Sequence, residues 1–254
     1  MMKYRIVVDS TVYLSDEEIK KFQIKRASLN VIDKDETFKE LKIDNDFVYS
    51  RLENGHRLTT SQPSPGEFFD LYQEMFDEGA ELVFVVTLAQ PLSGTYQSAV
   101  LARTMLDEPN KVHIFESKMA AFGNEMLVLE LQRLIEEGKQ ASDIIKHVSD
   151  LNANSNLIFT VENLQHLSRS GRLSKAKAMI GSVLKVKPLI QMVDGKLDLF
   201  ASERTHKKVI AKIMTQIQET THNAKLIHFR ILSKNSMEQA KALEAQIKES
   251  FTNI

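Results

Sequence analysis

The sequence contains no cysteine and no tryptophan, and the first of these absences excludes whole classes of chemistry. Disulfide bonds and thiolate nucleophiles are impossible, which fits a protein of a reducing compartment. The N-terminal stretch MMKYRIVVDS also lacks the apolar core of a secretory signal peptide. Together these features predict a cytoplasmic protein.

An excess of positive charge and a long apolar run are missing as well. The formal net charge is −1, which argues against a nucleic-acid binder because such proteins usually present a basic face. No run approaches the roughly 18 apolar residues that indicate a membrane-spanning helix. At most a transient contact with a membrane surface is expected.

Short apolar runs alternate with helix-like patterns in the first half of the chain. The expected strands are residues 4–8, 24–32, 81–87 and 111–117, and the expected helices are residues 15–22, 44–52, 65–78, 95–106 and 124–137. Ser15 with Glu18, and Ser64 with Glu67, each have the spacing of a capping box. Strands that alternate with helices predict right-handed βαβ units and a parallel sheet.

The pattern changes near residue 156. The second half is expected to contain strands at 156–161 and 225–232, helical material up to about Leu184, a hairpin at 187–202, and helices from about 205 to 219 and from about 236. Asp194-Gly195 suits the type I′ turn of that hairpin. The sequence therefore predicts an N-terminal α/β domain, residues 1–155, and a C-terminal α+β domain, residues 156–254.

Hydroxyl-bearing residues gather where the expected strands of the first half end or turn. These segments are Asp9-Ser10-Thr11, Thr59-Thr60-Ser61, Ser93-Gly94-Thr95 and Glu116-Ser117. Ligands of an open parallel sheet bind beyond the carboxyl ends of its strands, and a helix N-terminus favours an anion. Gly94 lets the backbone approach closely, and the hydroxyls of Ser93 and Thr60 can donate to an oxyanion. The competing interpretation is that each hydroxyl is a plain helix N-cap.

Other chemistries have less support. Ser93 does not lie in a G-x-S-x-G motif, although a base from a distant segment would still make it a nucleophile. The seven histidines show no metal-ligand spacing, and no glycine loop of a standard nucleotide site occurs. The segment Ser168–Ser174 and Arg204 are phosphate-binding candidates, or else solvated turns.

Five segments in order form a more specific pattern than any one of them. They are DST at 9–11, TSQPS at 60–64, LSGTYQSA at 92–99, SGRLS at 170–174 and RTHKK at 204–208. In this order they resemble the DegV family, the fatty-acid-binding proteins that serve bacterial fatty-acid kinase. The resemblance covers essentially the whole chain, and TSQPS and LSGTYQSA are its most specific parts.

The resemblance implies that one long-chain fatty acid, such as palmitate, lies between an N-terminal α/β domain and a C-terminal α+β domain. Thr60 and Ser93 would hold its carboxylate, with the Gly94 N–H as a third donor. Ser61, Arg172 and Arg204 are candidate contacts to the head group or to a partner. The acyl chain would run into an apolar tunnel lined by both halves of the chain, including some phenylalanines and methionines.

The same resemblance implies a carrier, not an enzyme. The chain would use no cofactor and no metal, and it would present the carboxyl group to a separate fatty-acid kinase, which forms the acyl-phosphate. Two departures from the family pattern stand out. Glu116-Ser117 replaces the usual Asp-Ser, and the family's last strand and His-containing segment have no counterpart, so that histidine has no position here.

Two further hypotheses from other classes stay open. One is a hydrolase or transferase with Ser93 as its nucleophile, and the other is a regulatory or sugar-phosphate-binding module on a similar fold.

Overall fold

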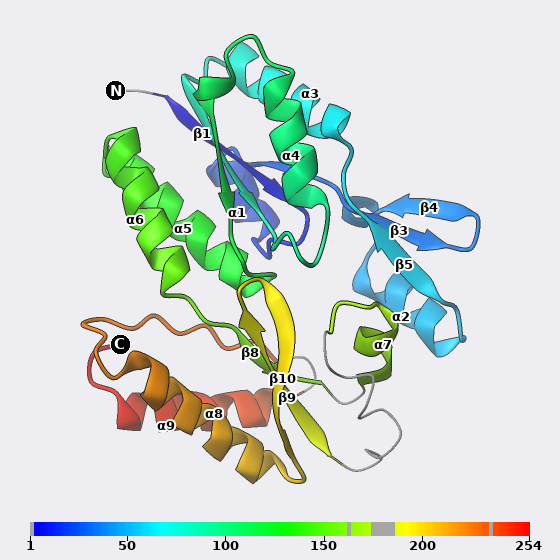
Figure 1. The fold of residues 1–254 in the computed structure, drawn as a ribbon, viewed down its shortest axis with the longest axis vertical. Helices are drawn as coiled ribbons and strands as arrows, with labels where there is room; N and C mark the ends of the chain where they lie inside the picture. The colour runs from blue at the N-terminus through cyan, green and yellow to red at the C-terminus, as the bar shows by residue number, and fades with distance from the viewer. Residues whose placement is uncertain (1–2, 162–163, 174–185, 234–235) are drawn as a thin grey trace. The chain divides into compact units, whose positions relative to one another are not determined.

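The computed structural model describes residues 3–161, 164–173, 186–233 and 236–254, which form two compact units (Figure 1). The first unit comprises Met1–Leu157 and Met192–Lys196, and the second comprises Ile158–Gln191 and Leu197–Ile254. We propose that these units correspond to the domains 1–155 and 156–254 expected from the sequence.

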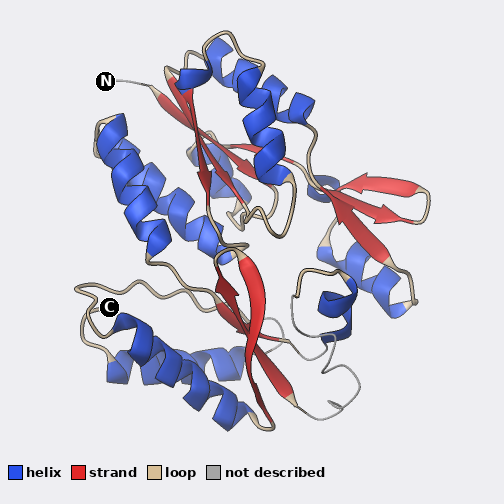
Figure 2. Cartoon of the chain, viewed as in Figure 1, coloured by secondary structure: helices blue, strands red, loops and turns tan. Residues whose placement is uncertain are grey.

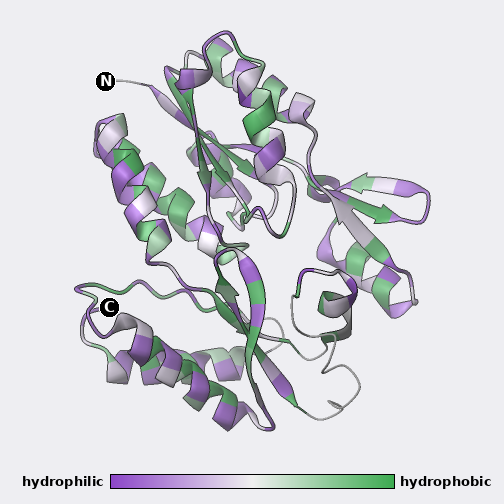
Figure 3. Cartoon of the chain, viewed as in Figure 1, coloured by the Kyte–Doolittle hydropathy of each residue, from purple (hydrophilic) through white to green (hydrophobic). Residues whose placement is uncertain are grey.

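A four-stranded parallel sheet forms the centre of the first unit, as the alternation of strands and helices predicts. Its strand order is β2-β1-β6-β7. The strands are β1 (Tyr4–Asp9), β2 (Lys25–Ala27), β6 (Leu82–Thr87) and β7 (Val112–Glu116). Figure 3 shows these strands coloured mainly as hydrophobic, which is the pattern of a parallel sheet buried on both faces.

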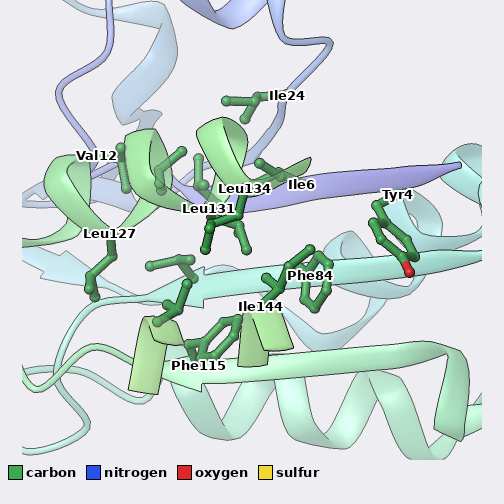
Figure 4. Packing of buried hydrophobic residues seen from close by; sticks show 14 of the residues in the cluster. Tyr4, Ile6, Val12, Ile24, Phe84, Phe115, Leu127, Leu131, Leu134 and Ile144 are labelled. Atoms are coloured by element: carbon green, nitrogen blue, oxygen red, sulfur yellow. The ribbon is translucent and has the colours of Figure 1, made fainter. Parts of the chain in front are cut away.

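Helices cover both faces of this sheet (Figure 1). Side chains of β1 alternate between the faces: Ile6 and Val8 pack with one apolar cluster, and Val7 packs with the other. The first cluster includes residues of α5 (Phe122–Glu136) and α6 (Ala141–Ala153), and Figure 4 shows Leu131, Leu134 and Ile144 packed near Phe84. The second includes residues of α3 (Pro65–Asp77) and α4 (Thr95–Thr104). The sheet is therefore a rigid base for the loops at its ends.

A second, antiparallel sheet projects from the first unit (Figure 2). Its order is β4-β3-β5, and its strands are β3 (Asn30–Asp33), β4 (Glu36–Lys39) and β5 (Leu58–Ser61). The short helix η1 (Glu40–Lys42) and α2 (Asn45–Glu53) connect β4 to β5. His56 bonds to Asp33 through Nδ1 and Oδ2, 2.7 Å apart, and Arg51 of α2 pairs with the same carboxylate.

The prediction of one strand over residues 24–32 is wrong, because the run splits between the two sheets at Ser28. Ser28 N–H donates to Glu67 Oε1 (2.7 Å), and Leu29 N–H donates to Ser10 Oγ (2.9 Å). These side-chain acceptors replace the strand partners that the backbone would otherwise need, so the chain turns away from the parallel sheet. Strands β4 and β5 were not expected from the sequence.

The helix starts follow the predicted capping residues with one exception. Ser15 and Glu18 form the expected capping box at the start of α1 (Asp16–Lys21). Ser64 caps α3 by accepting from Glu67 N–H. The capping box predicted there is wrong, since the Glu67 carboxylate binds Ser28 N–H and Lys39 Nζ instead. Three helices, η1, α6 and the short helix η2 (Pro109–Lys111), were not expected.

The second unit combines most of a three-stranded sheet with helices, as its mixed pattern predicts, and the turn Met192–Lys196 of this sheet belongs to the first unit. The sheet order is β10-β9-β8, and the elements are β8 (Ile158–Thr160), α7 (Leu164–Arg169), β9 (Lys187–Val193), β10 (Lys196–Glu203), α8 (His206–Thr221) and α9 (Met237–Ser250). Asp194 and Gly195 have φ of +46° and +75°, which confirms the predicted tight turn between β9 and β10. The helical prediction for residues 174–184 lies outside the described residues.

The strand predicted at residues 225–232 is wrong. The segment has an alternating pattern, but no strand is assigned to it, and its contact with another extended segment is the bond from Ile227 N–H to Asn253 O (2.8 Å). A β-strand needs a partner ladder, which the alternation of residues in one segment cannot supply.

Candidate functional site

The candidate site lies at the carboxyl end of the parallel sheet, where the strand order reverses. From β1 the chain continues to β2 on one side, whereas β6 and β7 lie on the other. The crevice at such a switch point is where open α/β sheets bind ligands. The loops after β1 and β6 and the start of α4 meet here.

Asp9 joins the first two of these loops. Its side chain is 0% exposed, and it accepts bonds from Leu88 N–H (2.7 Å) and from the N–H and hydroxyl of Thr11 (2.9 and 2.5 Å). Burial raises the pKa of the Asp9 carboxyl, and these bonds offset part of that rise. The sequence indicates the turn at Asp9, but it gives no sign of the long-range bond to Leu88.

The rest of the loop after β6 is fixed in the same way. Ala89 N–H donates to Met119 O (2.8 Å), Gln90 N–H to Glu116 Oε1 (3.1 Å) and Leu92 N–H to Ala89 O (3.0 Å). The loop therefore enters the next segment with its backbone donors satisfied, and it holds Ser93 in a defined place.

The N-terminus of α4 differs from this loop, because its backbone N–H groups lack acceptors among the described residues. Its N-cap is Gly94, and no side chain caps it. Among the described residues, no acceptor binds any N–H from Ser93 to Gln97, while Ser98 N–H begins the helical bonding to Gly94 O (3.0 Å). Free N–H groups at the start of a ten-residue helix form an anion-binding site.

Ser93 is not an N-cap, so the capping interpretation is wrong for this residue. Its Oγ lies 2.9 Å from Oγ1 of Thr95, a side chain that is fully buried. The hydroxyl is half-buried beside the free N–H groups, and either oxygen of this pair can be the donor. It can therefore turn toward an anion that binds there.

The TSQPS segment meets the start of α4 through Gln62 and Gly94. A Cβ on Gly94 would lie 3.1 Å from Cδ and 3.2 Å from Nε2 of Gln62, closer than ordinary contacts. Thr60 lies two residues before Gln62, in β5 opposite Val31 of β3, and its side chain is exposed. The structure thus brings together the two segments that contain Thr60 and Ser93.

Ser61 points to the other face of β5, where its Oγ accepts from Asn30 Nδ2 (3.0 Å). Arg172 and Arg204 belong to the second unit. Arg172 is exposed and donates to Ser170 O (2.7 Å), in a turn where Gly171 has a φ of +76°. Arg204 is also exposed, directly before Thr205, which caps α8.

The arrangement around Ser93 does not favour a nucleophile. Within the described ranges, the Ser93 hydroxyl bonds to Thr95 and to no histidine or carboxylate that would act as its base. No group of three or more histidine, aspartate or glutamate side chains among the described residues could hold a metal ion. Nor does any helix in the described ranges combine the length and apolarity needed to cross a bilayer.

Comparison with known proteins gives a consistent result. The model of the DegV family, described as "Uncharacterised protein, DegV family", matches residues 3–254. A DegV domain-containing protein of Halalkalibacterium halodurans is 31% identical over 256 residues, which cover 100% of this chain and 90% of that protein.

Two solved structures show the same likeness in three dimensions. One is Bacillus subtilis DegV, described as a fatty acid binding protein: it is 31% identical, with a TM-score of 0.80, over 98% of this chain and 89% of that one. The other is a DegV family protein from Thermus thermophilus, described with fatty acid binding: it is 26% identical, with a TM-score of 0.90, over 100% and 90%.

Proposed function

Because the chain belongs to the DegV family, we propose that it binds a long-chain fatty acid, such as palmitate, with the carboxylate at the start of α4. The observation that supports this most directly is the run of N–H groups from Ser93 to Gln97 without an acceptor among the described residues. The two related structures described as fatty-acid-binding, from Bacillus subtilis and Thermus thermophilus, give the ligand class.

In this proposal Ser93 Oγ and Gly94 N–H donate to one side of the carboxylate, and Thr60 donates from β5. The donors are neutral, and the backbone that carries Ser93 and Gly94 is held before the ligand arrives, because Asp9 and Glu116 bind the preceding loop. A hydrogen bond to a charged acceptor contributes about 1.5–3 kcal/mol. These groups therefore orient the head group without the cost of burying an opposite charge.

The acyl chain supplies most of the affinity. A sixteen-carbon acid has about fourteen CH₂ groups, and burying each contributes about 0.8 kcal/mol, or about 11 kcal/mol before ordering costs. We propose that an apolar tunnel lined by both halves of the chain takes this tail, as expected from the sequence.

We further propose that the protein is a carrier that works in the cytoplasm and presents the carboxylate to a separate fatty-acid kinase. Hydroxyl and backbone donors bind the carboxylate without a fixed salt bridge, so the carboxylate stays available to a partner kinase. Arg172 and Arg204 are exposed in the second unit and are candidate contacts to that kinase.

The carrier is expected to hold its ligand through purification. Native mass spectrometry should show the protein with one added long-chain acid, and a solvent extract should contain that acid in about equimolar amount. A fluorophosphonate that targets activated serines should leave Ser93 unlabelled, since no base among the described residues bonds to it. Labelled Ser93, or a protein that neither contains nor takes up a fatty acid, would contradict the proposal.

The protein alone is not expected to phosphorylate its ligand. Incubation with palmitate and Mg-ATP should give acyl-phosphate only when the cognate kinase is added, because the sequence has no phosphate-binding glycine loop. Acyl-phosphate formed without the kinase, at a rate above that of a Thr60/Ser93 double variant, would identify this chain as an enzyme.

A further inference from the structure

We propose that Glu67 is a positioning residue that holds the antiparallel sheet against α3, and that this sheet swings on a hinge when a ligand enters or leaves. We name residues 29–61, which contain β3, β4, η1, α2 and β5, the arm. The chain enters the arm after Ser28 and leaves it at Gln62. The inference rests on the proposed fatty-acid binding, and it adds the step by which the ligand is exchanged.

The arm is not packed into the core of the first unit. Among the described residues, the two apolar clusters on the faces of the parallel sheet include no residue of the arm. Figure 2 shows the arm projecting to one side of that sheet. Buried apolar surface is the main force that holds one element against another. A part of the chain that lacks such packing opens at a lower cost in free energy than the core does.

Inside the arm, in contrast, the contacts are close. The rings of Phe38 and Phe47 meet edge to face with their centroids 4.9 Å apart, and the Arg51 guanidinium lies 5.2 and 4.5 Å from these centroids. Arg51 and His56 both bind the buried carboxylate of Asp33. These contacts join α2 to β3 and β4, so the arm moves as one body.

Glu67 of α3 joins the arm to the rest of the first unit. Its Oε1 accepts from Ser28 N–H (2.7 Å), where the chain leaves the parallel sheet, and its Oε2 accepts from Lys39 Nζ (2.5 Å) at the end of β4. Ser28 is buried, so its N–H has no access to water when this acceptor is lost. One carboxylate thus holds both segments at the base of the arm.

Movement of the arm would change the head-group site. Thr60 lies in β5, within the arm, opposite Val31 of β3. Ser93 lies outside the arm, directly before α4. In the proposed complex these two hydroxyls bind the same carboxylate, so a swing of the arm separates them and releases the head group. Closing of the arm brings them together again.

The test measures how fast cis-parinaric acid, a fluorescent long-chain acid, binds to and leaves the fatty-acid-free full-length protein. The chain has no tryptophan, so its own fluorescence is weak. Glu67→Ala removes both bonds, and we expect the arm to open about tenfold more often. Because the ligand passes through the open arm, association and dissociation should both become about tenfold faster, while Kd changes less than about threefold.

Two variants make the kinetic result specific. Glu74→Ala is the matched control, because Glu74 is also on α3 and pairs with Lys25 of β2 at the same distance of 2.5 Å, outside the arm. Its rates should equal those of the wild type. Lys39→Met breaks the ion pair but keeps the bond to Ser28 N–H, so the fold is preserved and both rates should rise about two- to fivefold.

Hydrogen exchange of backbone amides, followed by NMR, reports the hinge without any ligand. Leu29 N–H donates to Ser10 Oγ (2.9 Å) and Leu41 N–H to Ser28 Oγ (3.2 Å), and neither amide bonds to Glu67. Both should exchange about tenfold faster in Glu67→Ala, because they are freed when the arm opens. Amides of the ladder within the arm should keep their wild-type rates, since the arm moves as one body.

Several outcomes would overturn the proposal while the carrier function stands. One is unchanged parinarate kinetics in both Glu67→Ala and Lys39→Met. Another is a Kd that rises as much as the dissociation rate, which would make Glu67 an ordinary structural residue. A third is faster exchange throughout the arm, which would mean local unfolding in place of a hinge. A wild type that binds neither parinarate nor palmitate would refute both the proposal and the carrier function.

Discussion

Palmitate affinity is expected to fall about 100-fold when Thr60 and Ser93 are both replaced by alanine. Each hydroxyl donates to the carboxylate in the proposed complex, and the lower value of about 1.5 kcal/mol for each bond gives about 3 kcal/mol in total. The backbone donors of Ser93–Gln97 remain, so binding should weaken without disappearing. Titration of the fatty-acid-free protein with palmitate measures the change.

The stability of this double variant should fall only modestly. Ser93→Ala leaves the buried Thr95 hydroxyl without its partner at 2.9 Å, a loss of about 1–3 kcal/mol. The Thr60 side chain is exposed, and its hydroxyl bonds to no described residue. Thr95→Val removes the same internal bond but keeps the Ser93 hydroxyl, so it is the control for Ser93. Thr59→Ala is the control for Thr60, because Thr59 is its exposed neighbour on the opposite face of β5.

These controls make the outcome decisive. Affinity that falls in Ser93→Ala but not in Thr95→Val assigns the loss to the head-group contact. An unchanged palmitate titration in the double variant would show that the carboxylate binds elsewhere. The thermal midpoint should be measured without ligand, so that loss of ligand stabilisation is not mistaken for a change in the fold.

The sequence predicts the parallel sheet and most of its helices because their signals are local. Buried runs such as Leu82–Thr87 and caps such as Ser15 depend on neighbouring residues. The break at Ser28 depends on Glu67 and Ser10, which lie far away in the chain. The failed strand at 225–232 shows the converse, since its alternating pattern is present but the part of the chain that the structure describes forms no partner ladder with it.

In the candidate site, too, the sequence indicates some features and gives no sign of others. Motifs and hydroxyl-rich turns indicate Thr60, Ser93 and Gly94, because residue types and their order suffice to recognise them. Gln62 lies in the TSQPS segment, but the sequence gives no sign of its contact with Gly94, because that contact exists only in three dimensions. The signal that could have suggested it is the pairing of a glycine at a helix start with a polar residue in the neighbouring motif.

The second large effect is expected at Asp9, where function and stability should respond differently. Asp9→Asn keeps the side-chain shape, but its NH₂ group must face either Leu88 N–H or Thr11 N–H, both of which now donate to the carboxylate. The loop that positions Ser93 would shift, and we expect palmitate affinity at pH 7.5 to fall at least about tenfold, since small displacements of a binding group are costly. Glu116→Gln is the matched control, because its Oε1 can still accept from Gln90 N–H.

The stability of Asp9→Asn relative to the wild type should depend on pH. Burial raises the native pKa of Asp9, so its contribution to folding is fully present below the unfolded pKa of about 3.9 and is lost as pH rises through the native pKa. Asparagine does not titrate, so the wild type's advantage in thermal midpoint should shrink from pH 4 to pH 8. Burial also raises the pKa of the nearby Glu40, with the charge of Asp9 adding to that rise, so the series is repeated in Glu40→Gln. An advantage that grows with pH would mean that the bonds from Thr11 and Leu88 outweigh burial, and that Asp9 stabilises the fold as an ion.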